Sequence, residues 1–184
     1  MDYLKLYDLE TYLFEKVSRR FSDLGYLTAF DFFCIVIWKA NRSKSIIAKR
    51  LLAQEYPNLD DAVVALTKSL ANAVDDKARM KALIEDWGFR LPMASAILTV
   101  LYPDSFTVYD WRVCEAIGGF FNLHNKTNFD SLWNDYEAFV AAVNKAEPSE
   151  YSLRDKDRWL WGKSFCQQLK QDIAEKFQKK KVDD

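Results

Sequence analysis

Apolar residues recur along the chain at the three- and four-residue spacing that is typical of amphipathic helices. No stretch alternates steadily between apolar and polar residues, and the 184 residues include only five glycines and four prolines. The pattern therefore predicts an all-α protein. The helices are expected to begin at or near Asp8, Thr28, Ser43 or Ser45, Asp60 or Asp61, Asp75 or Asp76, Pro92, Asp110, Asn128 or Asp130, and Ser152.

Two of these starts resemble a capping box, in which side chains and backbone N–H groups bond reciprocally at a helix start. They are Thr28 with Asp31 and Ser152 with Asp155. The final helix can run to about Lys179. Its apolar residues fall near one broad face: Leu153, Trp159, Leu160, Phe165, Leu169, Ile173 and Phe177.

The stretch from Trp87 to Val113 joins two helices through a tight turn. Gly88 directly follows a helical pattern, where a helix end often needs a positive φ. Pro92 suits the first turn of the next helix, because an N–H at that position would be unpaired. Small and apolar residues continue until Pro103 ends this helix, and a short extended segment then leads to Asp110.

This arrangement resembles the helix-hairpin-helix DNA glycosylase superfamily, in which an extended segment after the hairpin delivers an aspartate at a helix start. The matching run here is Val108-Tyr109-Asp110-Trp111-Arg112-Val113, and the hairpin covers about residues 75–101. The chain differs from the family in keeping only Gly88 of the hairpin glycines. It also has Pro92 where bifunctional members carry the Schiff-base lysine. The resemblance implies a single unit over residues 1–184, with two helical lobes and no lyase activity.

The resemblance also implies the site residues. Asp110 is the candidate catalytic residue, because the family's aspartate stabilises the oxocarbenium-like sugar and helps to activate water. N–H groups at the start of the second hairpin helix favour an anion such as a DNA phosphate. The predicted DNA-binding residues are Gly88, Arg90, Met93, Ala94, Ser95 and Arg112. The predicted base pocket comprises Trp38, Trp111 and Trp161.

Each candidate also has a purely structural interpretation. Asp110 can cap the following helix, which is compatible with a catalytic role. Arg112 can form an ion pair with Glu115 or with an acid of the final helix. We favour an ion pair of either kind over a phosphate contact. The hairpin can be a purely structural helix–turn–helix connection with an exposed Arg90 side chain. Lys39 can match the negative end of a helix dipole, and tryptophans in helical proteins lie mostly in the core.

Three functions are compatible with these residues. The first is a single-function DNA base glycosylase, which the spacing of Asp110 favours. The second is a non-catalytic relative that binds DNA or a protein through the same cleft. The third is a compact interaction module with a structural hairpin. The missing glycines and the net charge of −1 favour the second and third.

Composition narrows the expected cofactors and location. The three scattered cysteines form no CxxC pair, and an iron–sulfur cluster needs four cysteinates. The single histidine, His124, has no partner at metal-ligand spacing, so we expect no metal and no cofactor. No apolar run reaches the roughly 18 residues of a membrane span, and the first residues lack a signal-peptide layout. We therefore expect a cytoplasmic monomer that binds DNA and no membrane.

Overall fold

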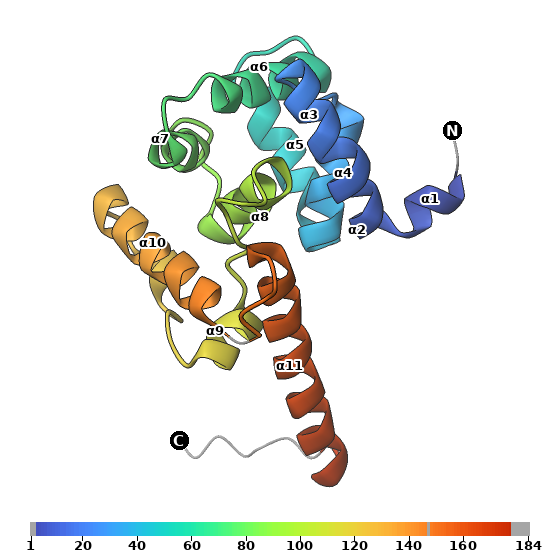
Figure 1. Cartoon of the computed structure of the whole chain (residues 1–184). Helices are drawn as coiled ribbons and strands as arrows, with labels where there is room; N and C mark the ends of the chain where they lie inside the picture. The colour runs from blue at the N-terminus through green and yellow to red at the C-terminus, as the bar shows by residue number, and fades with distance from the viewer. Residues whose placement is uncertain (1–2, 147, 178–184) are drawn as a thin grey trace.

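A computed structural model describes residues 3–146 and 148–177, and the regular secondary structure within these ranges is entirely helical (Figure 1). The all-α prediction is confirmed. Before the hairpin come α1 (Tyr3–Tyr7), α2 (Leu9–Tyr12), α3 (Ser18–Leu24), α4 (Ala29–Ala40), α5 (Lys44–Leu52), α6 (Leu59–Ala71) and α7 (Asp76–Lys81). After it come α8 (Leu91–Leu101), α9 (Trp111–Ile117), α10 (Phe129–Lys145) and α11 (Leu153–Ala174). Two π-helical stretches, Leu13–Val17 and Ala82–Asp86, join α2 to α3 and extend α7.

Local capping explains most of the helix starts. The Thr28 hydroxyl accepts a hydrogen bond from the Asp31 N–H at 3.3 Å, and the Ser152 hydroxyl accepts one from the Asp155 N–H at 3.1 Å. The N-caps at Thr28 and Ser152 are confirmed, but the second contact of each predicted box runs from the cap hydroxyl to the Asp31 or Asp155 carboxylate and not from the cap N–H. Asp75 and Asn128, each one of two candidates, cap α7 and α10.

The start of α6 differs from the prediction. Asn58 caps this helix instead of Asp60 or Asp61, because its side-chain oxygen accepts a hydrogen bond from the Asp61 N–H at 2.9 Å. The Asp60 carboxylate accepts a hydrogen bond from the Ala29 N–H at 2.8 Å and so ties α6 to the start of α4. The preceding helix, α5, ends at Leu52.

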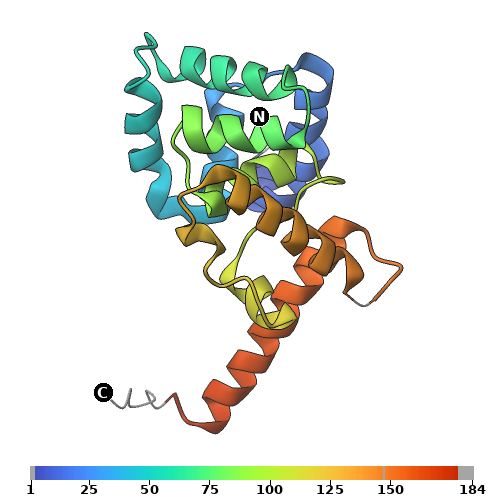
Figure 2. The same ribbon diagram turned by 90° about the vertical axis from the view of Figure 1, so that its left-hand side faces the viewer.

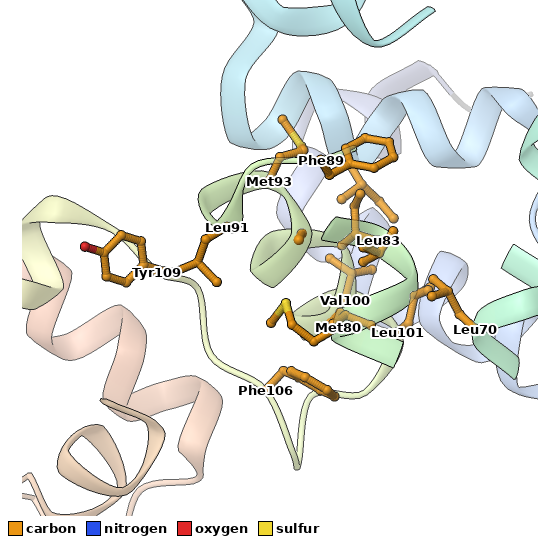
Figure 3. Close-up of a cluster of buried hydrophobic side chains, with 14 of the residues drawn as sticks. Leu70, Met80, Leu83, Phe89, Leu91, Met93, Val100, Leu101, Phe106 and Tyr109 are labelled. Atoms are coloured by element: carbon orange, nitrogen blue, oxygen red, sulfur yellow. The ribbon is translucent and has the colours of Figure 1, made fainter. Parts of the chain in front are cut away.

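Helix α8 lies at the centre of the core. Every residue of α8 is buried except Pro92, which is partly buried, and the helix contacts α3, α4 and α7. Figure 3 shows Val100 and Leu101 of α8 near Met80 and Leu83 from the segment before the hairpin. The buried side chains form one cluster that extends from α2 to α11, so a single core serves both sides of the hairpin.

Helix α11 departs from the expected core face. Leu160 is buried, whereas exposure rises along the helix to 38% at Leu169, 58% at Ile173 and 66% at Phe177 beyond its end. Figures 1 and 2 show the distal half of α11 projecting from the rest of the molecule. The apolar pattern therefore does not mark a buried face in this half. The expected end near Lys179 lies outside the described residues.

Candidate functional site

A pocket of about 480 Å³ lies where the end of α4 and residues 106–110 meet the first turns of α11. These elements come together at the upper end of α11 in Figure 1. The pocket is lined by Glu10, Trp38, Lys39, Val108, Asp110, Arg154, Asp157, Arg158 and Trp161.

Asp110 has two structural partners at the pocket. One carboxylate oxygen accepts a hydrogen bond from the Arg112 N–H at 3.0 Å, which caps α9 as predicted. The other accepts a hydrogen bond from Lys39 Nζ at 2.7 Å. The Asp110 side chain is 27% exposed, so a molecule in the pocket can reach it. The cap and the ion pair hold the carboxylate in one orientation.

The extended segment before Asp110 is fixed by buried polar groups. The Tyr109 N–H donates to the Ser95 hydroxyl at 2.9 Å. The Tyr136 hydroxyl accepts from the Thr107 N–H at 3.2 Å and donates to the Thr107 carbonyl at 2.7 Å. The Val108 N–H lies near the Asp157 carboxylate and acts to lower its pKa. These contacts determine where the Asp110 backbone lies.

Asp157 is a second carboxyl group of the pocket, and its side chain is almost fully buried. Burial raises its pKa to about 6, although the Arg154 guanidinium and the Val108 N–H act in the opposite direction. Arg154 Nη1 pairs with Asp157 at 2.5 Å. A carboxyl group that titrates close to neutral pH can exchange a proton with a bound molecule.

Arg154 connects α11 to the first half of the chain. Its Nη2 pairs with Glu10 at 2.7 Å, and its guanidinium carbon lies 4.6 Å from the Phe14 ring centroid and 5.3 Å from that of Trp38. Arg158 also pairs with Glu10, at 3.1 Å. Three acidic and three basic side chains thus line the pocket: Glu10, Asp110, Asp157, Lys39, Arg154 and Arg158. This balance suits a polar molecule better than one of high net charge.

The hairpin has the predicted turn but lacks the predicted N–H donors. Gly88 has φ +66°, and its carbonyl accepts a hydrogen bond from the Arg50 guanidinium. The Met93 and Ala94 N–H groups, expected to be unpaired, both donate to the Arg90 carbonyl at 3.0 Å. That expectation is wrong, because Arg90 lies at the N-cap position with its carbonyl turned toward the first turn of α8.

The hairpin side chains also differ from the expected phosphate contact. Met93, Ala94 and Ser95 are buried, and the Ser95 hydroxyl accepts the bond from Tyr109. Ser95 therefore positions the segment before Asp110 and presents no group to solvent. Arg90 remains exposed. The pocket lining includes none of these hairpin residues.

Among residues 3–146 and 148–177, Arg112 forms no ion pair with Glu115 or with an acid of α11, contrary to the interpretation that we favour from the sequence. Glu115 accepts a hydrogen bond from the Ser164 hydroxyl at 2.5 Å instead. The Arg112 guanidinium carbon lies 5.3 Å from the Trp161 ring centroid and 5.5 Å from that of Phe165. Of the three predicted base-pocket tryptophans, Trp38 and Trp161 line the pocket, whereas Trp111 lies outside the lining and is 55% exposed.

Several residues that line the pocket are not among the site residues predicted from the sequence. Lys39 was interpreted as a helix-end charge, and Glu10, Arg154 and Asp157 had no distinguishing motif. The only local signal is the spacing of Arg154 and Asp157, which places them on neighbouring positions of one helix. Their other partners are distant in the sequence and could not be recognised from it.

The chain was compared with known proteins, and no family model, curated protein or solved structure matches it. None of the described helices has the length and apolar character to cross a membrane. Residues 3–146 and 148–177 contain no group of three or more histidine, cysteine, aspartate or glutamate side chains that could hold a metal ion. The pocket residues therefore provide the main basis for a functional argument.

Proposed function

We propose that the chain binds DNA and that the pocket beside Asp110 receives an extruded base, whose bond to the sugar is then hydrolysed. The observation that carries this proposal is the placement of Asp110. It is a partly accessible carboxylate at a helix start that lines one pocket with Trp38 and Trp161. Aromatic side chains can replace the stacking that an extruded base loses. The cavity volume is within the roughly 300–1,000 Å³ of typical small-molecule sites.

The charge of Asp110 supports the chemical step. When the bond from the base to the sugar C1′ breaks, its electron pair leaves with the base and positive charge develops on the sugar. The Asp110 carboxylate stabilises that charge and accepts a proton from the attacking water, whose oxygen becomes the C1′ hydroxyl. Asp157 can supply a proton to the departing base, because its pKa of about 6 leaves part of it protonated near neutral pH. Lys39 orients Asp110.

DNA binding is tested with a duplex that carries an abasic-site analogue, by measuring the dissociation constant over a salt series. A protein that contacts Z phosphates gives a slope of about −0.9Z in a plot of log K against log salt concentration. We expect a clear negative slope. A flat response would remove both the glycosylase and the DNA-binding interpretations.

Catalysis is tested with Asp110→Asn on a panel of duplexes with damaged bases. Asparagine is also a good N-cap, so we expect the free energy of unfolding to change by less than about 1 kcal/mol. Base release should fall by at least about 100-fold, in line with the loss of a positioned base or charge. Asp104→Asn changes an exposed acid before the same segment and is the matched control. Borohydride should trap no protein–DNA adduct, because the proposed step is hydrolytic. Unchanged release in Asp110→Asn would exclude Asp110 as the catalytic group.

A second candidate is a protein-interaction module. The exposed apolar side chains of Leu169, Ile173 and Phe177 along the projecting part of α11 favour it. This candidate predicts salt-insensitive binding of a protein partner and no release from any lesion.

A further inference from the structure

We infer that a patch on α9 and α11, next to the pocket, is a stacking platform for the unpaired nucleotides that flank an extruded base. The platform comprises Arg112, Trp161, Gly162 and Phe165. The inference rests on the proposed DNA binding and extends it from the pocket to the neighbouring nucleotides. Trp161 also lines the pocket, so the platform and the pocket are continuous.

The two aromatic rings of the platform are fixed in nearly parallel planes. The Trp161 and Phe165 ring centroids are 5.5 Å apart, with 11° between the ring planes. Their side chains are 42% and 43% exposed, so a large part of the apolar surface faces solvent. Nucleobases stack on exposed aromatic rings regardless of sequence, because every base has a π face. Rings already held in place lose little freedom when a base binds.

Arg112 supplies an unused donor beside these rings. Its guanidinium lies over both of them, and Nη1 is buried without a hydrogen-bond partner among the described residues. The described ion pairs do not include Arg112, and the neighbouring Glu115 is bonded to Ser164. Buried N–H groups nearly always have an acceptor in native proteins. A small shift of the side chain would bring this guanidinium to a phosphate or base oxygen, which are both acceptors.

The packing of the protein gives no reason for a glycine at position 162. It lies inside α11, four residues after Arg158 and three before Phe165, and therefore on their face of the helix. Apart from its chain neighbours and the nearby backbone of α11, no atom of the described residues lies within 4 Å of the position that a Cβ would take. Glycine is a poor helix former, so protein packing alone gives no reason for it here. Without a side chain, the surface between Arg158 and Phe165 stays flat and open to a base.

The charge around the platform favours nucleic acid as the occupant. Arg158 pairs with Glu10 and Asp155 but is 59% exposed, and Lys163 Nζ lies 5.2 Å from the Trp159 ring centroid on the same part of α11. Aromatic and cationic groups thus alternate near the pocket, which is the combination that single-stranded nucleic acid binds. The aliphatic side chains Leu169 and Ile173 lie farther along, where a protein partner would find an apolar surface.

The platform is tested with a short single-stranded oligothymidylate, by fluorescence anisotropy of the oligonucleotide and quenching of protein tryptophan fluorescence. Phe165→Leu keeps an apolar side chain but removes the π face. We expect it to weaken binding by about 5- to 100-fold, the range set by the stacking of one base on an aromatic side chain. Leu169→Ala is the matched control on the same helix and should change binding less than about twofold. Arg112→Gln should also weaken binding and make the salt slope shallower by about 0.7.

Gly162→Ala provides a test that misfolding cannot imitate. Alanine should raise the melting temperature while it weakens binding of the oligonucleotide, because the new methyl group occupies the flat surface. Tighter or unchanged binding with a raised melting temperature would contradict the platform.

The outcomes also separate this inference from the proposed function. At saturating duplex, the control Leu169→Ala should keep the rate constant of base release, whereas Asp110→Asn should lose it. Absence of oligothymidylate binding by the wild-type protein, or equal binding by Phe165→Leu and wild type, would overturn the platform and leave the base-release test unaffected. If Phe165→Leu and Leu169→Ala instead both abolish self-association in sedimentation experiments, the face is a protein interface and the inference is wrong.

Discussion

Single buried polar groups determine where the pocket residues lie. Ser95 is fully buried in α8, and its hydroxyl accepts the Tyr109 N–H one residue before Asp110. The buried Asp157 carboxylate lies near the Val108 N–H of the same segment. A buried backbone N–H without a partner is costly, so these side chains hold the segment in one path.

Ser95→Ala tests this positioning role. The substitution leaves the Tyr109 N–H without its acceptor in the core, and we expect it to lower the free energy of unfolding by about 1–3 kcal/mol. Urea denaturation followed by circular dichroism measures the change. Ser105→Ala, at an exposed position before the segment, should have little effect. Equal stability of Ser95→Ala and wild type would show that the hydroxyl does not hold the segment.

Asp157 should make the protein less stable as the pH rises. An exposed carboxylate in an ion pair has the opposite effect, because its stabilising contribution is lost as the pH falls. Burial raises its folded-state pKa from 3.8 to about 6, so the folded protein holds the proton to higher pH than the unfolded chain. Its contribution to stability is therefore present below about pH 4 and is lost as the pH rises through about 6, at up to about 1.4 kcal/mol per pH unit. The difference in unfolding free energy between wild type and Asp157→Asn should change across this window. Parallel pH profiles for the two proteins would contradict the raised pKa.

At the scale of the elements, Gly88 and Gly162 differ in backbone conformation. Gly88 ends the π-helical stretch after α7 with φ +66°, and the Phe89 N–H donates to the Leu83 carbonyl at 2.8 Å across it. This is the usual geometry of a helix end closed by a left-handed residue. Gly162 lies within α11 at an ordinary helical position. Only the first position requires glycine for the backbone conformation.

The paired substitutions Gly88→Ala and Gly162→Ala should therefore change stability in opposite directions. Alanine at Gly88 must adopt the left-handed conformation, which costs about 1–2 kcal/mol, although its Cβ would meet Arg50 only at an ordinary contact of 3.8 Å. Alanine at Gly162 should stabilise α11 by about 0.5–1 kcal/mol. Thermal unfolding of both variants measures the difference. A gain in stability from Gly88→Ala would contradict the assigned turn.

At the scale of the whole molecule, Arg154 links the last helix to the first part of the chain. It bonds Asp157 on its own helix and Glu10 on α2, and it covers the rings of Phe14 and Trp38. Helix α11 otherwise packs mainly on α9 and α10. The pocket lies along this junction, so its shape depends on the link.

Arg154→Ala should open the junction and destabilise the protein. It removes the main partner of a buried carboxylate, and breaking such a pair costs about 3–5 kcal/mol. Hydrogen exchange should increase in α2 and in the first turns of α11, with smaller changes in α6. Arg19→Ala, which removes an exposed arginine on α3, is the control. An equal increase in hydrogen exchange in all helices of the variant would indicate that the junction does not open separately from the rest of the protein.

The sequence by itself determined the features that depend on local backbone chemistry. The helical periodicity, the N-caps at Thr28 and Ser152, the turn at Gly88 and the cap at Asp110 were all predicted from nearby residues. Each depends on hydrogen bonds or dihedral angles within a few positions of the chain. Such interactions leave a readable pattern at fixed spacing.

Only the tertiary structure decided which side chains meet at the pocket. Lys39 bonds Asp110 across 71 positions, and Arg154 bonds Glu10 across 144. The position of Ser95 in the core and the solvent exposure of distal α11 are equally non-local, because burial depends on what the rest of the chain places against a residue. Charged residues occur in every described α-helix except α8, and their partners are set by packing. Sequence spacing alone therefore could not select Lys39, Arg154 or Asp157 from the other charged side chains.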